Sequence, residues 1–176
     1  MTRAGVDHHD FDTAIGRCTI VWNADDAVVA MLLPDESDCS RFELGTPGVP
    51  SESVADIAAA VTLLLAGGDP GHRLATATID LAACTDFDRR VYGVTRSIKR
   101  GDTLTYGEVA ARLAAPGAAQ AVGLALGRNP IPILVPCHRV VGADALGGFS
   151  AGGGPATKAM LLGIEGAPGF GEPTLF

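Results

Sequence analysis

The sequence predicts a small α/β domain over residues 1–83, followed by a mainly α domain over residues 84–176 that contains a helix-turn-helix. Apolar and polar residues alternate in the first half, as they do in half-buried strands, around one helical stripe. From Asp86 the apolar residues recur at helical spacing instead. With 176 residues, of which 47% are apolar and 19% are charged, the chain is long enough for two small packed domains.

The first half predicts a hairpin near the N-terminus. Residues 13–33 alternate around Asp25-Asp26, and this break in the pattern predicts the turn. The residues before the hairpin are polar and include the pair His8-His9. Two adjacent histidines can bind a metal, but the polar surroundings favour a flexible terminus.

A loop, a helix and a further strand are expected next. Residues 34–50 are rich in Pro, Asp, Ser and Gly, which predicts the loop. Residues 51–66 carry an apolar stripe at helical spacing, and Ser51 or Ser53 can cap this helix. Alternation returns over residues 74–81 and predicts the strand.

The second half predicts three helices in succession. The first covers residues 87–98. The second opens at Thr105, which has the spacing of a capping box with Glu108, and runs to about Leu113. The third covers residues 118–128. A Pro-Gly turn separates the second helix from the third, and two short helices joined in this way predict a helix-turn-helix.

The third predicted helix is almost without bulk. Its small residues are Ala118, Ala119, Ala121, Gly123 and Ala125. Such a helix can be a tight packing element, or it can bring its backbone close to a nucleic-acid groove. A glycine-rich loop over residues 142–155 then leads into a last helix over residues 156–165. The glycines of this loop form turns or give a substrate access to the backbone.

The run Pro136-Cys137-His138-Arg139 carries the strongest chemical signal. It follows the apolar stretch 129–135, so the thiol lies between apolar residues with an imidazole and a guanidinium beside it. The thiolate is the reactive form of cysteine, and neighbouring cations are expected to lower its pKa below about 8.5. The alternative is a buried structural cysteine without a chemical role.

The spacing of the other cysteines indicates whether they form a zinc site or disulfides. Cys18, Cys39 and Cys84 lie far apart and form no C-x-x-C pair with each other or with Cys137, which argues against a zinc site. The N-terminal residues include no apolar signal segment, and no apolar run approaches the length of a membrane helix. We therefore expect a cytoplasmic protein without a disulfide framework.

Asn129-Pro130, the run 133–141 and Glu165-Gly166 together resemble the active-site signature of the alkylguanine-DNA alkyltransferases, or methylated-DNA–protein-cysteine methyltransferases. The resemblance spans residues 87–166, with the N-terminal half as looser support. It implies a small RNase H-like sheet with a helix in the first domain and a winged-helix-like second domain.

The resemblance implies a role for each of five residues. Cys137 accepts the alkyl group, His138 reaches the thiol through a water molecule, and Glu165 orients His138. Asn129 braces the turn between the third helix and the active-site segment. Tyr106 donates a proton to the departing guanine ring.

The resemblance also implies the residues that contact substrate and DNA. The walls of the pocket for the flipped base are expected at Val140, Val141, Phe149 and Ser150, with Lys158 near the rim. Contacts with DNA are expected from Thr105, Gln120, Ala121, Gly123, Arg128 and Arg139. The chain departs from the family at Gln120, where an arginine is common, and at Phe149, where a tyrosine is frequent.

The implied reaction is displacement at a saturated carbon, which needs a soft sulfur nucleophile and no oxyanion hole. The alkyl group moves from O6-alkylguanine to Cys137, with O4-alkylthymine as a second candidate substrate. A thioether is a poor leaving group, so each molecule reacts once and is consumed. The reaction needs no cofactor or metal, and the expected partner is double-stranded DNA with alkylated guanine, bound by a monomer.

The charge distribution is compatible with this partner. Residues 1–80 carry 4 basic and 13 acidic side chains, whereas residues 81–176 carry 9 basic and 7 acidic side chains, within a total net charge of −7. Contacts with phosphate are therefore expected from the second half, with weak nonspecific affinity.

Three other functions are compatible with part of the pattern. A damage sensor would bind alkylguanine without repairing it, but family members of this kind lack the cysteine. A helix-turn-helix regulator whose cysteine signals alkylation or oxidation would carry more basic and base-reading side chains. A thiol hydrolase would use Cys137 and His138 as a pair, but adjacent residues tend to point apart.

Overall fold

The computed structural model describes residues 5–34 and 44–170, so Cys39 lies outside the described part. The chain divides into two compact units. The first unit consists of residues 1–81 and 130–134, and the second consists of residues 82–129 and 135–176. The chain therefore leaves the second unit for five residues and returns to it, which the sequence did not indicate.

The first unit is built on a four-stranded sheet in the order β3-β2-β1-β4. Strands β1 (Val6–Thr13), β2 (Gly16–Asn23) and β3 (Val28–Leu32) are antiparallel neighbours, and β4 (Thr46–Pro47) pairs with β1 in parallel. The predicted hairpin is confirmed as β2 and β3, because the chain turns between Asn23 and Val28.

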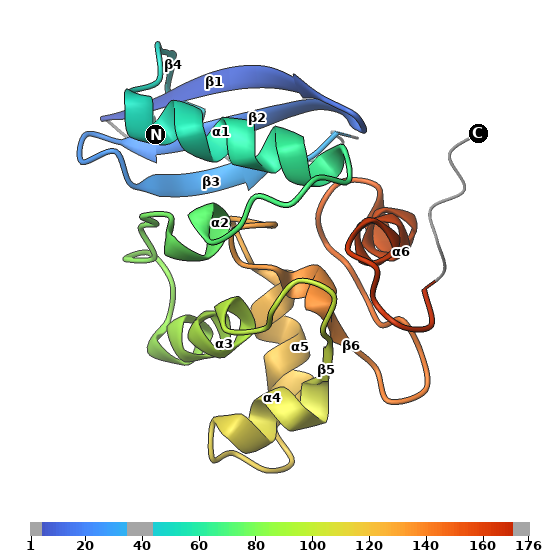
Figure 1. Cartoon of the computed structure of the whole chain (residues 1–176). Helices are drawn as coiled ribbons and strands as arrows, with labels where there is room; N and C mark the ends of the chain where they lie inside the picture. Colours follow the sequence, from blue (N-terminus) through green and yellow to red (C-terminus); the bar gives the residue numbers. More distant parts are fainter. Residues whose placement is uncertain (1–4, 35–43, 171–176) are drawn as a thin grey trace. The chain divides into compact units, whose positions relative to one another are not determined.

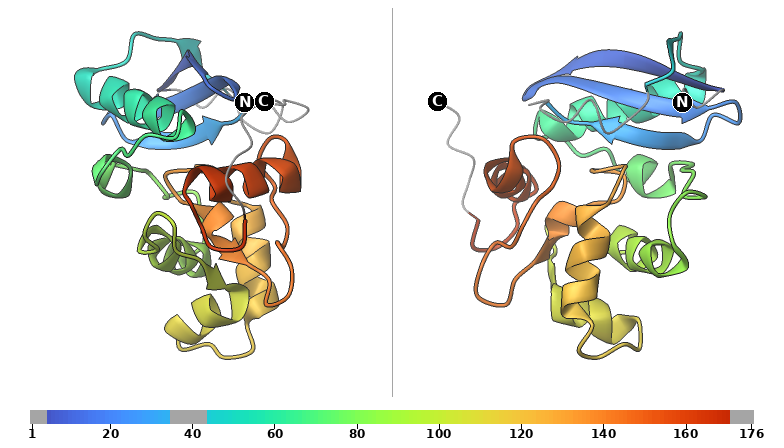
Figure 2. Two further views of the ribbon diagram at one scale, coloured as in Figure 1. Left: turned by 45° about the vertical axis from the view of Figure 1, so that its right-hand side comes forward. Right: turned by 180° about the vertical axis from the view of Figure 1, so that it is seen from behind.

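Helix α1 (Glu52–Leu65) lies along one face of this sheet in all three views (Figures 1 and 2). Ser51 is its N-cap, and the side chain of Ser51 accepts a hydrogen bond from the Val54 amide. The buried face of the helix carries the apolar stripe that the sequence shows. The stripe consists of Val54, Ile57, Ala58, Ala60, Val61, Leu64 and Leu65.

Two predictions for the first unit were wrong. Residues 6–13 form strand β1 instead of a flexible terminus, because their backbone pairs with β2 although their side chains are mostly polar. His8 in this strand hydrogen-bonds the carbonyl of Leu44 through Nδ1 at 2.8 Å. Residues 73–76 form the short helix α2 (Arg73–Thr76) instead of a strand, and only a single bridge at Ile79 pairs with Val28.

Residues 130–134 belong to the first unit and follow directly on Asn129. The carbonyl of Pro130 accepts a hydrogen bond from the amide of Met31 in β3 at 3.0 Å. The apolar residues Ile131, Ile133 and Leu134 are buried. Ile133 has a φ of +73°, a left-handed conformation that is strained for a β-branched residue.

The second unit contains the predicted helices. Its helices are α3 (Asp86–Arg96), α4 (Tyr106–Arg112), α5 (Ala119–Gly127) and α6 (Gly154–Ile164). Helices α3, α4 and α5 contact one another pairwise. The buried Tyr92 on α3 joins two of them, because its hydroxyl donates to the carbonyl of Ala125 on α5 at 2.8 Å.

A small parallel sheet connects the helix-turn-helix to the segment after Cys137. Strand β5 (Leu104–Thr105) pairs with β6 (Val140–Val141), directly before α4 and directly after the 3-10 helix Cys137–Arg139. This pairing fixes the start of α4 close to the cysteine. None of the helices in the described ranges is long and apolar enough to cross a membrane.

Candidate active site

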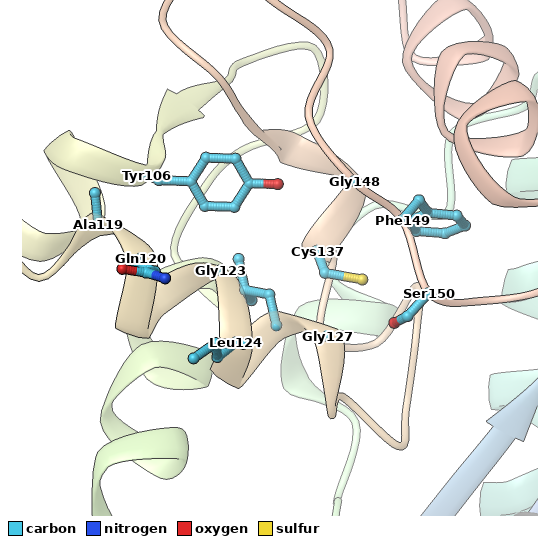
Figure 3. Close-up of a pocket in the computed structure, with 11 residues that line it drawn as sticks. Tyr106, Ala119, Gln120, Gly123, Leu124, Gly127, Cys137, Gly148, Phe149 and Ser150 are labelled. Carbon is cyan, nitrogen blue, oxygen red and sulfur yellow. The ribbon is translucent and has the colours of Figure 1, made fainter.

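A pocket of about 600 Å³ lies in the second unit and reaches the sulfur of Cys137 (Figure 3). Its walls come from α4, from one side of α5 and from the loop after β6. Its lining is mostly apolar or glycine: Tyr106, Ala119, Gln120, Gly123, Leu124, Leu126, Gly127, Cys137, Gly148, Phe149 and Ser150. The pocket therefore offers apolar walls to a flat ring, and the largely buried Cys137 thiol forms part of one wall.

Cys137 begins the 3-10 helix, and its residue surface is only 6% exposed. The Asn129 amide nitrogen Nδ2 donates to the Cys137 sulfur at 3.3 Å and to the carbonyl of Val135 at 2.9 Å. Asn129 follows α5 directly, so this side chain ties the end of that helix to the segment that carries the thiol. The bracing geometry expected for Asn129 is present.

The expectation of a lowered thiol pKa was wrong. Burial raises the pKa of the Cys137 thiol, and the hydrogen bond from Asn129 and the charge of Lys158 oppose this only in part. The adjacent imidazole and guanidinium do not lower it, because both side chains are turned toward Glu165. The resting protein therefore holds a thiol, and a proton must leave before sulfur can attack.

His138 and Glu165 form a buried pair behind the cysteine. His138 Nε2 lies 3.0 Å from Glu165 Oε1, and Glu165 follows α6 as its C-cap. The other ring nitrogen, Nδ1, is buried and has no hydrogen-bond partner among the described residues. A buried polar atom of this kind commonly bonds to an ordered water, so Nδ1 is the available site for a proton in transit.

Arg139 completes this pair and does not lie on the surface. Its guanidinium donates to both oxygens of Glu165, at 2.9 and 2.8 Å, and to the carbonyl of Ile98 at 2.6 Å. Burial alone would raise the pKa of Glu165, but hydrogen bonds from His138 and Arg139 lower it to about 2. The DNA contact expected for Arg139 is thus replaced by an inward ion pair, and the side chain is only 13% exposed.

Tyr106 and Lys158 form a second polar pair beside the pocket. Lys158 is fully buried, not at the rim as expected, and its Nζ donates to the carbonyls of Val140 at 2.6 Å and Gly148 at 2.9 Å. The same nitrogen lies 3.5 Å from the Tyr106 hydroxyl. Burial lowers the pKa of Lys158 to about 8. The pKa of Tyr106 is raised, mainly by burial and also by the charge of the nearby Cys137 thiolate. The phenol therefore keeps its proton at neutral pH.

A capping box stabilises the start of α4, the first helix of the helix-turn-helix. The Thr105 hydroxyl accepts from the Glu108 amide at 3.1 Å, and the Glu108 carboxylate accepts from the Thr105 amide at 2.7 Å, which is the predicted capping box. Thr105 was expected to contact DNA, but its hydroxyl is occupied in this cap. The turn between the helices passes through left-handed conformations at Ala114 and Gly117.

The side of α5 that lines the pocket matches the prediction only in part. Gln120 and Gly123 line it, whereas the exposed Ala121 does not. Arg128 follows the helix, and its Nη2 donates to the buried carboxylate of Asp88 at 2.6 Å. Arg128 therefore joins the end of α5 to the start of α3, which the sequence could not show.

Two of the predicted pocket walls are absent from the lining, and several others were missed. Phe149 and Ser150 line the pocket, but Val140 and Val141 are buried in β6 and do not. The missed lining residues include Ala119, Leu124, Gly127 and Gly148. The spacing of four between positions 119, 123 and 127, and between 120 and 124, was the signal that places them on one side of the helix.

Fold and site together define a class of protein: an α/β unit linked to a helix-turn-helix unit whose second helix borders a pocket with a buried thiol. Comparison with known proteins is consistent with this class. The family model for the DNA-binding domain of 6-O-methylguanine DNA methyltransferase matches residues 86–167. A crystal structure of Mycobacterium tuberculosis OGT in complex with DNA aligns with a TM-score of 0.73 and 33% identity, over 93% of this chain and 96% of that chain.

Two curated relatives carry the same name, methylated-DNA–protein-cysteine methyltransferase. The methylated-DNA–protein-cysteine methyltransferase of Mycobacterium bovis is 50% identical over 93 residues, which are 52% of this chain and only 55% of that protein. The protein of that name from Methanothermobacter thermautotrophicus is 36% identical over 148 residues, which are 84% of this chain and 78% of that protein. The chain belongs to the methylated-DNA–protein-cysteine methyltransferase family, as the resemblance predicted.

Proposed function

We propose that the protein repairs DNA by moving a methyl or larger alkyl group from O6 of guanine to the sulfur of Cys137. One observation carries this proposal: the Cys137 sulfur, held by Asn129, opens into a largely apolar pocket bordered by the second helix of a helix-turn-helix. A base that has rotated out of a duplex fits such a pocket, because the pocket walls supply apolar contacts to its ring.

The thiol proton leaves through His138. In this step a water between the sulfur and Nδ1 takes the Cys137 proton and passes one to Nδ1, and the Glu165 carboxylate stabilises the imidazolium through Nε2. Arg139 keeps Glu165 ionised and oriented. Because burial raises the thiol pKa, deprotonation occurs together with attack and not before it.

The sulfur then attacks the alkyl carbon. A carbon–sulfur bond forms, the carbon–O6 bond breaks, and its electron pair stays on the guanine. Tyr106 gives its phenolic proton to the guanine anion, and the ammonium of Lys158, 3.5 Å from the hydroxyl, stabilises the phenolate. The product is a thioether, and because a thioether is a poor leaving group each molecule reacts once.

The finer description of the molecule forms part of the same proposal. We infer that residues 1–83 form a small RNase H-like domain and that residues 84–176 form a winged-helix-like domain which binds DNA and accepts the alkyl group. The parallel pair β5 and β6 next to the helix-turn-helix supports the second description. The protein would act as a monomer in the cytoplasm, with O4-alkylthymine as a second candidate substrate.

Intact-protein mass spectrometry tests the function. Mixed with an excess of duplex that contains O6-methylguanine, the protein should gain one methyl group and then stop. Peptide mapping should place the methyl on Cys137. The matched variants are Cys137→Ala, which should gain nothing, and Cys84→Ala, which should react like the parent protein. Repeated turnover, or a methyl on Cys18, Cys39 or Cys84, would contradict the proposal.

A further inference from the structure

Leu124 is an exposed leucine on a helix that otherwise exposes only Gln120 and Ala121. Its residue surface is 59% exposed, although leucine is among the residues that folded proteins bury most often. The other apolar side chains of α5 behave as expected, since Val122, Ala125 and Leu126 are buried. Leu124 thus places an unburied isobutyl group on the outer side of the helix.

The surroundings of Leu124 let another molecule come close. Leu124 lies one turn after Gln120, and both line the pocket that reaches Cys137 (Figure 3). The neighbouring lining positions on this helix are Ala119, Gly123 and Gly127, which have little or no side chain. Leu126 also lines the pocket, but it is only 5% exposed. Among the lining side chains of α5, Leu124 and Gln120 are therefore the two that a substrate meets as exposed groups.

The chemistry of α5 limits what Leu124 can contact. All nine residues of the helix are uncharged, so the helix offers phosphate no ion pair. Its exposed side chains match the inside of a DNA groove, where deoxyribose and base edges present apolar surface and a few hydrogen-bonding groups. Apolar side chains that enter a groove separate stacked bases, and leucine is one of the residues found in this position.

We propose that Leu124 is an apolar wedge that packs against the duplex next to the extruded nucleotide and resists its return to the stack. Gln120, one turn earlier, supplies the polar contact beside it. This inference rests on the proposed function and adds a residue that determines the preference for duplex substrate. Burial of the leucine side chain against the duplex stabilises the extruded state, whereas in the single strand there is no stack for it to hold open.

The experiment compares single-turnover methyl transfer on duplex and single-stranded DNA of the same sequence. Leu124→Ala should lower the duplex-to-single-strand rate ratio by about 10-fold, which corresponds to loss of most of one leucine burial. Leu124→Met, which restores length and apolar surface, should recover most of the ratio. Leu63→Ala is the matched control, because Leu63 is an exposed leucine on α1 in the other unit, and it should leave the ratio unchanged.

A second readout separates extrusion from affinity. With 2-aminopurine as the target base and Cys137→Ala as the background, Leu124→Ala should reduce the fluorescence gain at saturating protein. The wedge would be overturned if Leu124→Ala left the rate ratio unchanged or raised the duplex rate. An equal loss of rate on both substrates would also overturn it, because Leu124 would then act as a wall of the pocket. Failure of the parent protein to gain a methyl would instead contradict the proposed function itself.

Discussion

At Gly147 the backbone has a φ of +77°, and a Cβ built there would lie 2.7 Å from the Tyr106 hydroxyl and 2.9 Å from the ring. The loop after β6 therefore packs its backbone directly against the phenol that is proposed to protonate guanine. Only glycine allows both the left-handed conformation and this contact. The sequence showed a glycine-rich loop, but it could not show which glycine the tyrosine requires.

Gly147→Ala should therefore displace Tyr106 as well as strain the backbone. We expect a loss of stability of about 1 kcal/mol or more, together with slower methyl transfer in single-turnover assays. Gly148→Ala is the control, because a Cβ there would meet nothing within 4 Å. The two variants should differ clearly in rate. Equal rates would show that the position of the phenol does not depend on residue 147.

The lowered pKa of Glu165 predicts that the stability of the protein depends on pH. Its pKa is about 2 in the folded protein, against about 4.3 for an unperturbed glutamate. The unfolded chain therefore binds more protons between these values, so the stabilisation by this carboxylate is complete above about pH 4.3 and is lost as the pH falls toward 2. Replacement by glutamine removes the titration.

Urea unfolding of the parent protein and of Glu165→Gln should show this window. The parent should be more stable by about 3 kcal/mol near pH 7, because the variant leaves Arg139 buried without its anion. The difference should shrink as the pH is lowered from about 4.3. Glu52→Gln, at an exposed position at the start of α1, should show no such convergence. A difference that stays constant down to low pH would exclude the ion pair as its source.

The sequence predicted which proposed catalytic residues lie close together better than it predicted the orientation of the side chains around them. Cys137, His138, Glu165, Asn129 and Tyr106 lie together in the second unit, as the resemblance implied. The inward orientation of Arg139 and Lys158 was not predictable, because each cation is buried by partners that are distant in sequence. The carboxylate of Glu165 and the carbonyls of Val140 and Gly148 are such partners.

At the scale of elements, local signals were reliable where a cap was present. Ser51, Thr85 and Thr105 each cap the helix that follows through their side chains, so α1, α3 and α4 begin close to where the sequence places them. Strand β1 was missed because its side chains are mostly polar and its stability comes from backbone pairing with β2. Helix α2 was mistaken for a strand because a single buried leucine, Leu74, anchors it.

Thr105→Ala tests whether this residue acts through the helix or through DNA. Loss of the cap should cost about 1 kcal/mol of stability and lower the melting temperature, and it should loosen the start of α4, where Tyr106 is located. Thr105→Ser keeps the hydroxyl and should retain nearly all of the stability. Thermal unfolding together with DNA titration gives the answer. Weaker DNA binding at an unchanged melting temperature would assign Thr105 to the DNA surface instead.

At the scale of the whole molecule, the division into two units does not follow one cut in the chain. Residues 130–134 connect Asn129 to Val135, both in the second unit, but they pack in the first. Ile131, Ile133 and Leu134 are 0%, 2% and 1% exposed. No local pattern distinguishes this apolar run from the one that continues it toward Cys137, so the sequence could not assign it to the first unit.

A fragment of residues 82–176 should consequently expose these three side chains. Burial of each contributes about 1.5–3 kcal/mol, and the fragment should bind the dye ANS and melt at a lower temperature than the complete chain. Ile131→Ser within the fragment should reduce the dye signal, whereas in the complete chain it should destabilise the first unit. A fragment that neither binds dye nor loses thermal stability would show that residues 130–134 do not need the first unit.

The uncharged surface of α5 has a consequence for how the protein would find damage. Each phosphate neutralised by a protein cation lengthens the stay on undamaged DNA and steepens its dependence on salt. The nine residues of α5 carry no cation, and Arg128 at its end is paired with Asp88. If α5 is the element that enters the groove, as proposed, it would add little to the time spent at an undamaged site, and the molecule would scan by many short visits interrupted by diffusion. If each molecule reacts once, as proposed, the number of sites that it inspects before that reaction limits how much damage a given amount of protein can find.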